Sequence, residues 1–149
     1  MHKFFKILFF IVLGFFFLYP LQIFADEKIK IGLLVPITGD DKELGQEIIK
    51  STRIALKDLD TSKLEIYLKD TNSNPNTTMK SAIELRDMGI KIVIGPIFYK
   101  SLAYLDEVKE LTFLSLTNKT LQIPNNVIST GINAYSQMNT IKKFIEQNE

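Results

Sequence analysis

The sequence predicts an α/β fold, a three-layer sandwich in which helices cover both faces of a mainly parallel, five-stranded sheet. Short apolar runs alternate with segments of helical spacing through residues 26–149, and the joints between them are short. This alternation is typical of right-handed βαβ units, which build parallel sheets. The run Ile92–Ile94 is too short for a helix and stops at Gly95-Pro96, as a strand buried on both faces does. We expect one domain.

Residues 29–36, with the sequence IKIGLLVP, are predicted to form the first strand because the stretch is almost wholly apolar and ends in proline. A helix follows, where Asp40 and Glu43 resemble a capping box with Asp in place of Ser or Thr. The apolar face of this helix is spaced at 4, 7 and 4 residues and consists of Leu44, Ile48, Ala55 and Leu59.

Residues 64–68 form the predicted second strand, and the polar turn after it begins with Asp70. Asn74 followed by Pro75 is a strong helix start, because a capping side chain precedes a proline in the first turn. Gly89 closes this helix. Its buried stripe is predicted to hold Met79, Ala82 and Ile83.

The second half of the domain is predicted to contain three strands and two helices. The strands cover residues 90–95, 112–116 and 127–130. One helix runs from about residue 100 to residue 111. The last helix starts near Asn133 and places four apolar residues at helical spacing, Tyr135, Met138, Ile141 and Ile145.

Residues 1–25 are predicted to be a signal peptide that is cleaved after Ala25, since a short basic start precedes an apolar core. The alternative is an uncleaved anchor, because residues 7–25 are 19 residues without a charge, just enough to span a bilayer. The abrupt charge at Asp26 favours cleavage. In both cases residues 26–149 are exported. We expect a periplasmic protein that contacts the membrane only if the signal segment stays uncleaved.

The composition of the exported part excludes several kinds of function. The chain has no cysteine, and its only histidine, His2, lies in the predicted signal peptide. Ser-His and Cys-His dyads and the usual zinc sites therefore cannot form within residues 26–149, and we expect no enzyme activity. Without Lys3 and Lys6 the exported part has 16 basic and 17 acidic residues, a net charge of −1. A nucleic-acid partner is not expected.

Two shorter patterns approach a cofactor site without completing one. Residues 70–74 mimic the start of a calcium loop, but Pro75 stands where that loop needs glycine. Gly39 and Gly45 do not make a phosphate loop, because no Gly-Lys-Ser/Thr follows them. We therefore expect no cofactor and no metal.

Four segments follow one another in an informative order: KIKIGLLVPITG with ELGQ after it, LEIYLKDTNSNP, GIKIVIGPIFYKS and STGINAYSQ. With these segments, residues 28–145 resemble the amino-terminal lobe of the type I periplasmic binding proteins, the group of leucine/isoleucine/valine-binding proteins. The resemblance implies a single leucine-binding lobe over residues 26–149, with flavodoxin-like strand order. It also implies a non-catalytic substrate-binding protein of an ABC transporter for branched-chain or other amino acids, with a membrane permease as its partner.

The resemblance implies a ligand site at the carboxyl ends of the first, third and fourth strands, where open α/β sheets bind ligands. Its occupant would be a small amino-acid-like or anionic molecule. A helix starting near Lys100 would offer free backbone N–H groups to an anion. Alternatively, Lys100 is simply solvated and Tyr99 caps the edge of the core. The implied ligand-binding residues are Thr38, Gly39, Asp40, Tyr99, Lys100, Ser101, Thr117 and Asn118.

A second resemblance lies within the same family. ELGQ, KDTNSNP, IGPIF and LSLTN are similar to the penicillin-binding protein activators, which share the fold and act by contacting peptidoglycan synthases. Amino-acid binders place an aromatic residue where this chain has Leu44, and small Ser or Thr where it has Phe98 and Tyr99. Both departures favour a regulator of peptidoglycan synthesis as the alternative function.

The resemblance covers one lobe of a two-lobed family, in which the ligand is clamped between the lobes. The sequence ends at Glu149, where the family's chain crosses into the second lobe. We therefore expect a truncated or split product, or a half that pairs with another chain. One lobe buries less of a small ligand, so we expect weak binding, or a protein contact at Phe98 and Tyr99.

Overall fold

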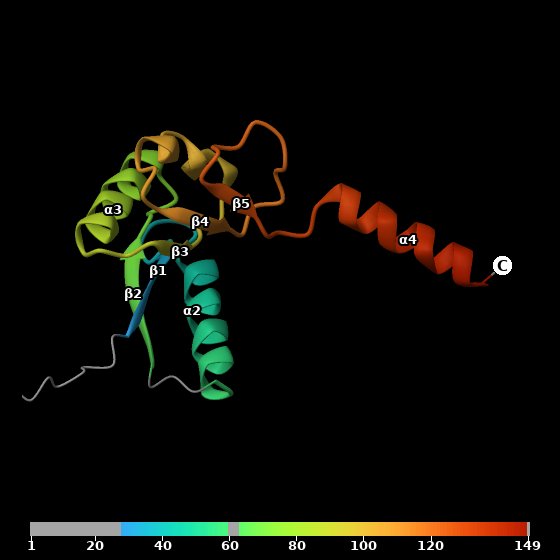
Figure 1. Ribbon diagram of the computed structural model, residues 1–149, viewed down its shortest axis with the longest axis horizontal. Coiled ribbons are helices and arrows are strands. Elements are labelled where there is room, and N and C mark those ends of the chain that lie inside the picture. The colour runs from blue at the N-terminus through green and yellow to red at the C-terminus, as the bar shows by residue number, and fades with distance from the viewer. Residues whose placement is uncertain (1–27, 60–62, 149) are drawn as a thin grey trace, which may run out of the picture.

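The computed structural model of the protein describes residues 28–59 and 63–148. These residues form a wholly parallel sheet in the order β2-β1-β3-β4-β5 (Figure 1). This is the flavodoxin-like order that the sequence implies. Each predicted strand is present to within two residues at either end. The strands are β1 (Ile29–Val35), β2 (Leu64–Asp70), β3 (Ile92–Ile94), β4 (Thr112–Ser115) and β5 (Val127–Ser129).

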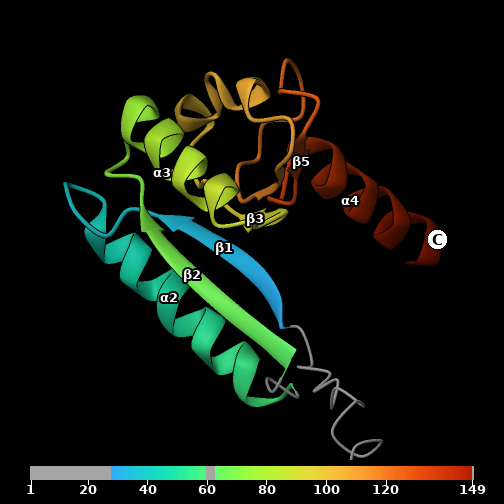
Figure 2. The ribbon, with the colours of Figure 1, turned by 60° about the vertical axis from the view of Figure 1, so that its left-hand side comes forward.

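Two helices form the outer layers of the sandwich. Helix α2 (Lys42–Lys57) and helix α3 (Pro75–Asp87) lie on opposite faces of the sheet (Figure 2). The α/β fold with helices on both faces is therefore confirmed. Asn74 begins α3 as predicted, since its side-chain oxygen accepts hydrogen bonds from the N–H groups of Asn76 at 2.9 Å and Thr77 at 3.3 Å.

The inward face of α2 differs from the predicted one. Leu44, Ala55 and Leu59 are exposed, and the only buried residue of the helix is Gly45. A β-carbon at Gly45 would lie 1.7 Å from the carbonyl oxygen of Pro36, so the helix meets the end of β1 backbone against backbone. This contact fixes the side of the helix that faces the sheet.

The main apolar core lies between the sheet and α3. Leu34 of β1, Leu85 of α3 and Phe113 of β4 are completely buried in it. Ala82 is buried as predicted, while Met79 and Ile83 are partly buried and pack against the same cluster. Burying each large side chain contributes about 1.5–3 kcal/mol, so this cluster dominates the stability of the domain.

The helix predicted over residues 100–111 is wrong. Two short 3-10 turns, η2 (Tyr99–Leu102) and η3 (Leu105–Glu107), take its place, and Tyr104 between them has a left-handed φ of 69°. The buried apolar residues of this segment recur every three positions, the period of a 3-10 turn. They are Leu102, Leu105, Val108 and Leu111.

Asn126 supports this irregular segment from the loop before β5. Its side-chain amide donates hydrogen bonds to the carbonyl oxygens of Leu105 at 2.8 Å, Val108 at 3.1 Å and Leu111 at 3.2 Å. A continuous α-helix would satisfy such carbonyls internally. Here the N–H groups of Val108 and Leu111 donate to the first two carbonyls, and the Asn126 amide donates to all three.

Helix α4 (Ala134–Asn148) starts where it was predicted but lies apart from the other layers, pointing away from the sheet (Figure 1). None of its residues is buried. The predicted signal peptide, residues 1–25, lies outside the described residues. Within the described residues, no helix is both long and apolar enough to cross a membrane.

Candidate functional site

The loop after β1 is fixed by a carboxylate at the end of β2. Asp70 accepts hydrogen bonds from the N–H of Ile37 at 2.8 Å, the hydroxyl of Thr38 at 2.5 Å and the N–H of Asn72 at 2.8 Å. Partial burial acts to raise the pKa of Asp70, but the hydrogen bonds from Thr38, Asn72 and Ile37 outweigh it and lower that pKa. Asp70 thus positions Thr38.

The three predicted site residues of this loop, Thr38, Gly39 and Asp40, are exposed. The predicted capping role of Asp40 is wrong, because the residue that precedes α2 is Asp41, and its side chain makes no capping hydrogen bond. Since β1 lies between β2 and β3, the loop is drawn toward the β2 side of the sheet edge by Asp70.

The loop after β3 begins with a close contact between strands. Gly95 has a φ of 103°, and a β-carbon there would lie 2.1 Å from the carbonyl oxygen of Leu34. Tyr99 and Lys100 then turn outward and are exposed. Ser101 is buried, and its hydroxyl has no hydrogen-bond partner among the described residues.

No helix N-terminus is available here for an anion, in contrast to the prediction. Turn η2 has four residues, and the N–H of Ser101 already donates to the carbonyl of Phe98 at 3.0 Å. Any charge recognition at this loop therefore depends on side chains.

The loop after β4 contains two of the predicted site residues, one buried and one exposed. Thr117 is 4% exposed; its hydroxyl oxygen accepts from the N–H of Lys119 at 3.3 Å, and its carbonyl accepts from the hydroxyl of Ser129 at 2.7 Å. Thr117 thus holds the loop in place. Asn118 is exposed.

The loops after β3 and β4 meet at an open cavity of about 430 Å³. Lys119 places its ammonium 5.3 Å from the centre of the Tyr99 ring, which is within the range of a cation–π contact. Leu102, Ile123 and Pro124 supply apolar lining. The polar lining residues are Tyr99, Lys100, Tyr104, Asp106, Lys119 and Gln122.

Two lysines and one carboxylate line this cavity, so its local charge favours an anion. The structure brings Tyr99 and Lys100 together with Lys119. The other six predicted site residues do not line the cavity: Thr38, Gly39, Asp40, Ser101, Thr117 and Asn118. Tyr104 and Gln122 were missed because they lie in segments whose path depends on tertiary packing. Their positive φ values, 69° and 53°, have no signal in the sequence.

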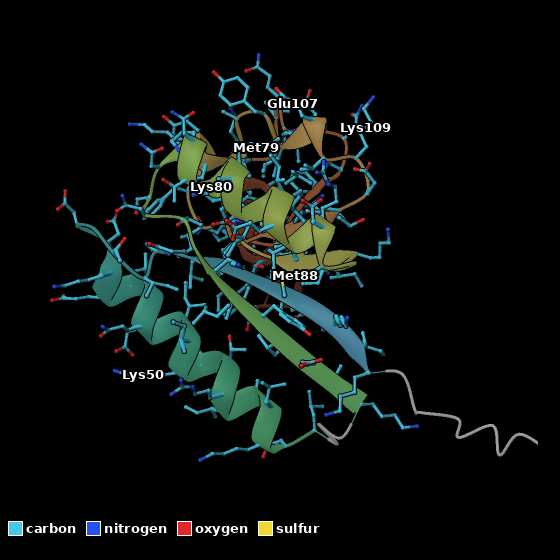
Figure 3. All side chains as sticks on the ribbon, turned by 90° about the vertical axis from the view of Figure 1, so that its left-hand side faces the viewer. Lys50, Met79, Lys80, Met88, Glu107 and Lys109 are labelled. Carbon is cyan, nitrogen blue, oxygen red and sulfur yellow. The ribbon has the colours of Figure 1, made fainter. Side chains whose placement is uncertain are left out.

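A second hollow, of about 580 Å³, lies between α3 and η3. Figure 3 looks onto this side of the molecule and labels Met79, Lys80 and Glu107 around it. None of the predicted site residues lines it. Among the described residues, no cluster of His, Cys, Asp and Glu could hold a metal ion.

No protein-family model matches the sequence, and no curated protein matches it. Several solved structures, however, are similar to the structure of this chain. The leucine-binding protein LivK from Thermotoga maritima is 19% identical over 80% of this chain, with a TM-score of 0.64. A branched-chain amino acid ABC-type transporter protein from Rhodopseudomonas palustris is 22% identical over 71% of the chain, with a TM-score of 0.61.

A third similar structure has a different described role. The C-domain of LpoA from Haemophilus influenzae, a regulator of PBP1A, is 24% identical over 76% of this chain, with a TM-score of 0.60. The chain spans 37% of LivK, 33% of the transporter protein and 37% of the LpoA domain. The fold therefore corresponds to a part of each of these larger structures.

Proposed function

We propose that this chain, which has the fold of one lobe of a type I periplasmic binding protein, is an exported, non-catalytic ligand-binding lobe. The observation that carries the proposal is the cavity where the loops after β3 and β4 meet, with Lys100 and Lys119 in its lining. Its volume lies within the range of small-molecule sites. The ligand class is a small amino-acid-like or other carboxylate-bearing molecule, which a permease would receive in a transport system.

The proposed roles of the site residues follow from their burial. Tyr99 and Lys100 are exposed, line the cavity and contact the ligand, while Ser101 and Thr117 hold the two loops in position. Asn118 is exposed but lies outside the cavity lining, so it contacts only a ligand that extends beyond the cavity. Thr38, Gly39 and Asp40 line the neighbouring part of the same sheet edge and contact a ligand that extends toward β1. Because the cavity is open on one side, a single lobe binds weakly.

Calorimetry tests this proposal. The chain from Asp26 is titrated with a panel of amino acids and short carboxylates at low salt. Lys100→Ala and Lys119→Ala should each weaken binding roughly three- to tenfold, the size of a partly exposed charge contact. Lys109→Ala removes an exposed lysine that does not line the cavity, and it should leave the affinity unchanged. Unchanged affinity in both cavity variants would place the ligand elsewhere, with Lys100 merely solvated.

An envelope regulator is the second candidate function, in which the same edge binds a peptidoglycan synthase. Two observations favour it: the similarity to the LpoA C-domain, and the exposure of Tyr99 (53%) and Tyr104 (56%) beside the cavity. Exposed aromatic residues are common anchors of protein interfaces. Tyr99→Ala with Tyr104→Ala should then abolish capture of a purified peptidoglycan synthase, while Tyr135→Ala on α4 should not.

A further inference from the structure

Three charged side chains line the cavity where the loops after β3 and β4 meet, and each comes from a different segment. Lys100 lies in η2, Asp106 lies in η3, and Lys119 lies in the loop after β4. Within the described residues, none of the three takes part in an ion pair. The carboxylate of Asp106 and the two ammonium groups are therefore free to pair with a ligand.

Lys119 is the best positioned of these charges. The residue is half-buried, and its ammonium lies 5.3 Å from the centre of the Tyr99 ring. Its backbone N–H donates to the hydroxyl of the buried Thr117 at 3.3 Å, which fixes the loop that carries it. Because a side chain that is already held in place loses less freedom on binding, Lys119 should contribute more to an anion contact than the exposed Lys100.

The rest of the lining indicates what lies between the charges of the ligand. Leu102, Ile123 and Pro124 provide apolar surface beside the charged groups. Tyr104 and Gln122 add a hydroxyl and an amide. A short aliphatic chain that carries charged groups along its length matches this mixture of a few polar groups on an apolar lining.

We propose that the ligand of this cavity is an acidic amino acid, which carries two carboxylates and one ammonium group. This inference rests on the proposed ligand-binding function and specifies its substrate class. The two carboxylates pair with Lys100 and Lys119, and the ammonium pairs with Asp106, so every charge meets an opposite one. An amino acid with an apolar side chain would leave one lysine unpaired. A simple dicarboxylate would leave Asp106 unpaired and close to like charge.

Three ligands with the same five-carbon skeleton test this charge count. L-glutamate has two carboxylates and an ammonium group, L-glutamine replaces one carboxylate by a neutral amide, and glutarate lacks the ammonium group. NMR titration of the isotope-labelled chain from Asp26 at low salt measures even weak dissociation constants. Glutamate should bind about three- to tenfold more tightly than either analogue, the size of one partly exposed charge contact.

Two variants assign the two preferences to individual side chains. Asp106→Asn should remove the preference for glutamate over glutarate and keep the preference over glutamine. Lys119→Gln should do the reverse, because the one remaining lysine can pair with only one carboxylate. Glu110→Gln removes an exposed carboxylate that does not line the cavity, and it should change neither preference.

The possible failures separate this inference from the proposed function. Glutamate that binds no more tightly than glutamine and glutarate would overturn the acidic ligand and leave a general carboxylate site in place. Unchanged preferences in Asp106→Asn and Lys119→Gln would also overturn it, because the selecting charges would then lie elsewhere. If none of the three ligands shifts the resonances of Tyr99 and Lys119, even at high millimolar concentration, the proposed function fails together with this inference.

Discussion

Helices α3 and α4 have similar lengths, 13 and 15 residues, and each begins with an asparagine cap, yet their surroundings are opposite. Helix α3 buries Thr78, Ser81, Ala82 and Leu85 against the sheet and the 3-10 turns. Helix α4 buries nothing. The difference shows that an apolar stripe does not by itself place a helix against the sheet.

The largest expected difference between the two helices appears when one large apolar side chain is removed from each. Leu85→Ala should lower the free energy of unfolding by about 2–5 kcal/mol, because it leaves a cavity in the main core. Phe144→Ala on α4 should change it by less than about 0.5 kcal/mol, because Phe144 is 67% exposed. Urea unfolding measures both, and similar losses would mean that α4 packs on the body.

Asn126→Ala should have the next largest effect, a loss of about 1–3 kcal/mol, because three carbonyl oxygens each lose a hydrogen bond. Asn125→Ala, at the exposed neighbouring position, is the matched control and should be nearly neutral. If the two variants unfold at the same urea concentration, the stability of the 3-10 segment does not depend on the Asn126 side chain.

The asparagine caps of α3 and α4 allow the same interaction to be compared in a buried helix and in an exposed one. Asn74→Ala should destabilise the whole domain by about 1 kcal/mol, since α3 unfolds with the core. Asn133→Ala removes an equivalent bond from α4 and should lower the helical circular dichroism signal without moving the main unfolding transition. A shift of that transition in both variants would show that the two helices unfold together.

The smallest effect concerns pH and Asp70. Its pKa is lowered in the folded chain, so its stabilising contribution is present above the unfolded value of about 3.9 and disappears as the pH falls toward the lower folded value. The difference in stability between the natural chain and Asp70→Asn should therefore shrink as pH decreases from 6 to 3. A constant difference across this range would contradict the assigned hydrogen bonds.

Much of the fold follows from local patterns in the sequence. The strands are apolar runs, and the starts of α3 and α4 are visible at Asn74 and Asn133. The predicted helix over residues 100–111 failed because a three-residue apolar spacing fits a 3-10 path as well as an α-helix over a short stretch. The face of α2 was misjudged because a backbone contact at Gly45, and not its largest apolar side chains, sets its orientation.

The candidate site was predictable only in outline. Loops that follow neighbouring parallel strands meet at one edge, so Tyr99 and Lys100 could be placed near the residues after β4. Two contacts could not be predicted: the hydrogen bond by which Asp70 holds Thr38, and the cation–π contact of Lys119. Both join residues at least 20 positions apart in sequence through loop packing. Burial of Ser101 and Thr117 likewise depends on contacts that no local pattern encodes.

Hydrogen exchange followed by mass spectrometry tests the contrast between α3 and α4 most directly. At low concentration the amides of α3 should be protected to the level of global unfolding, while those of α4 should exchange almost as fast as in a free peptide. Equal protection of both helices would contradict the account.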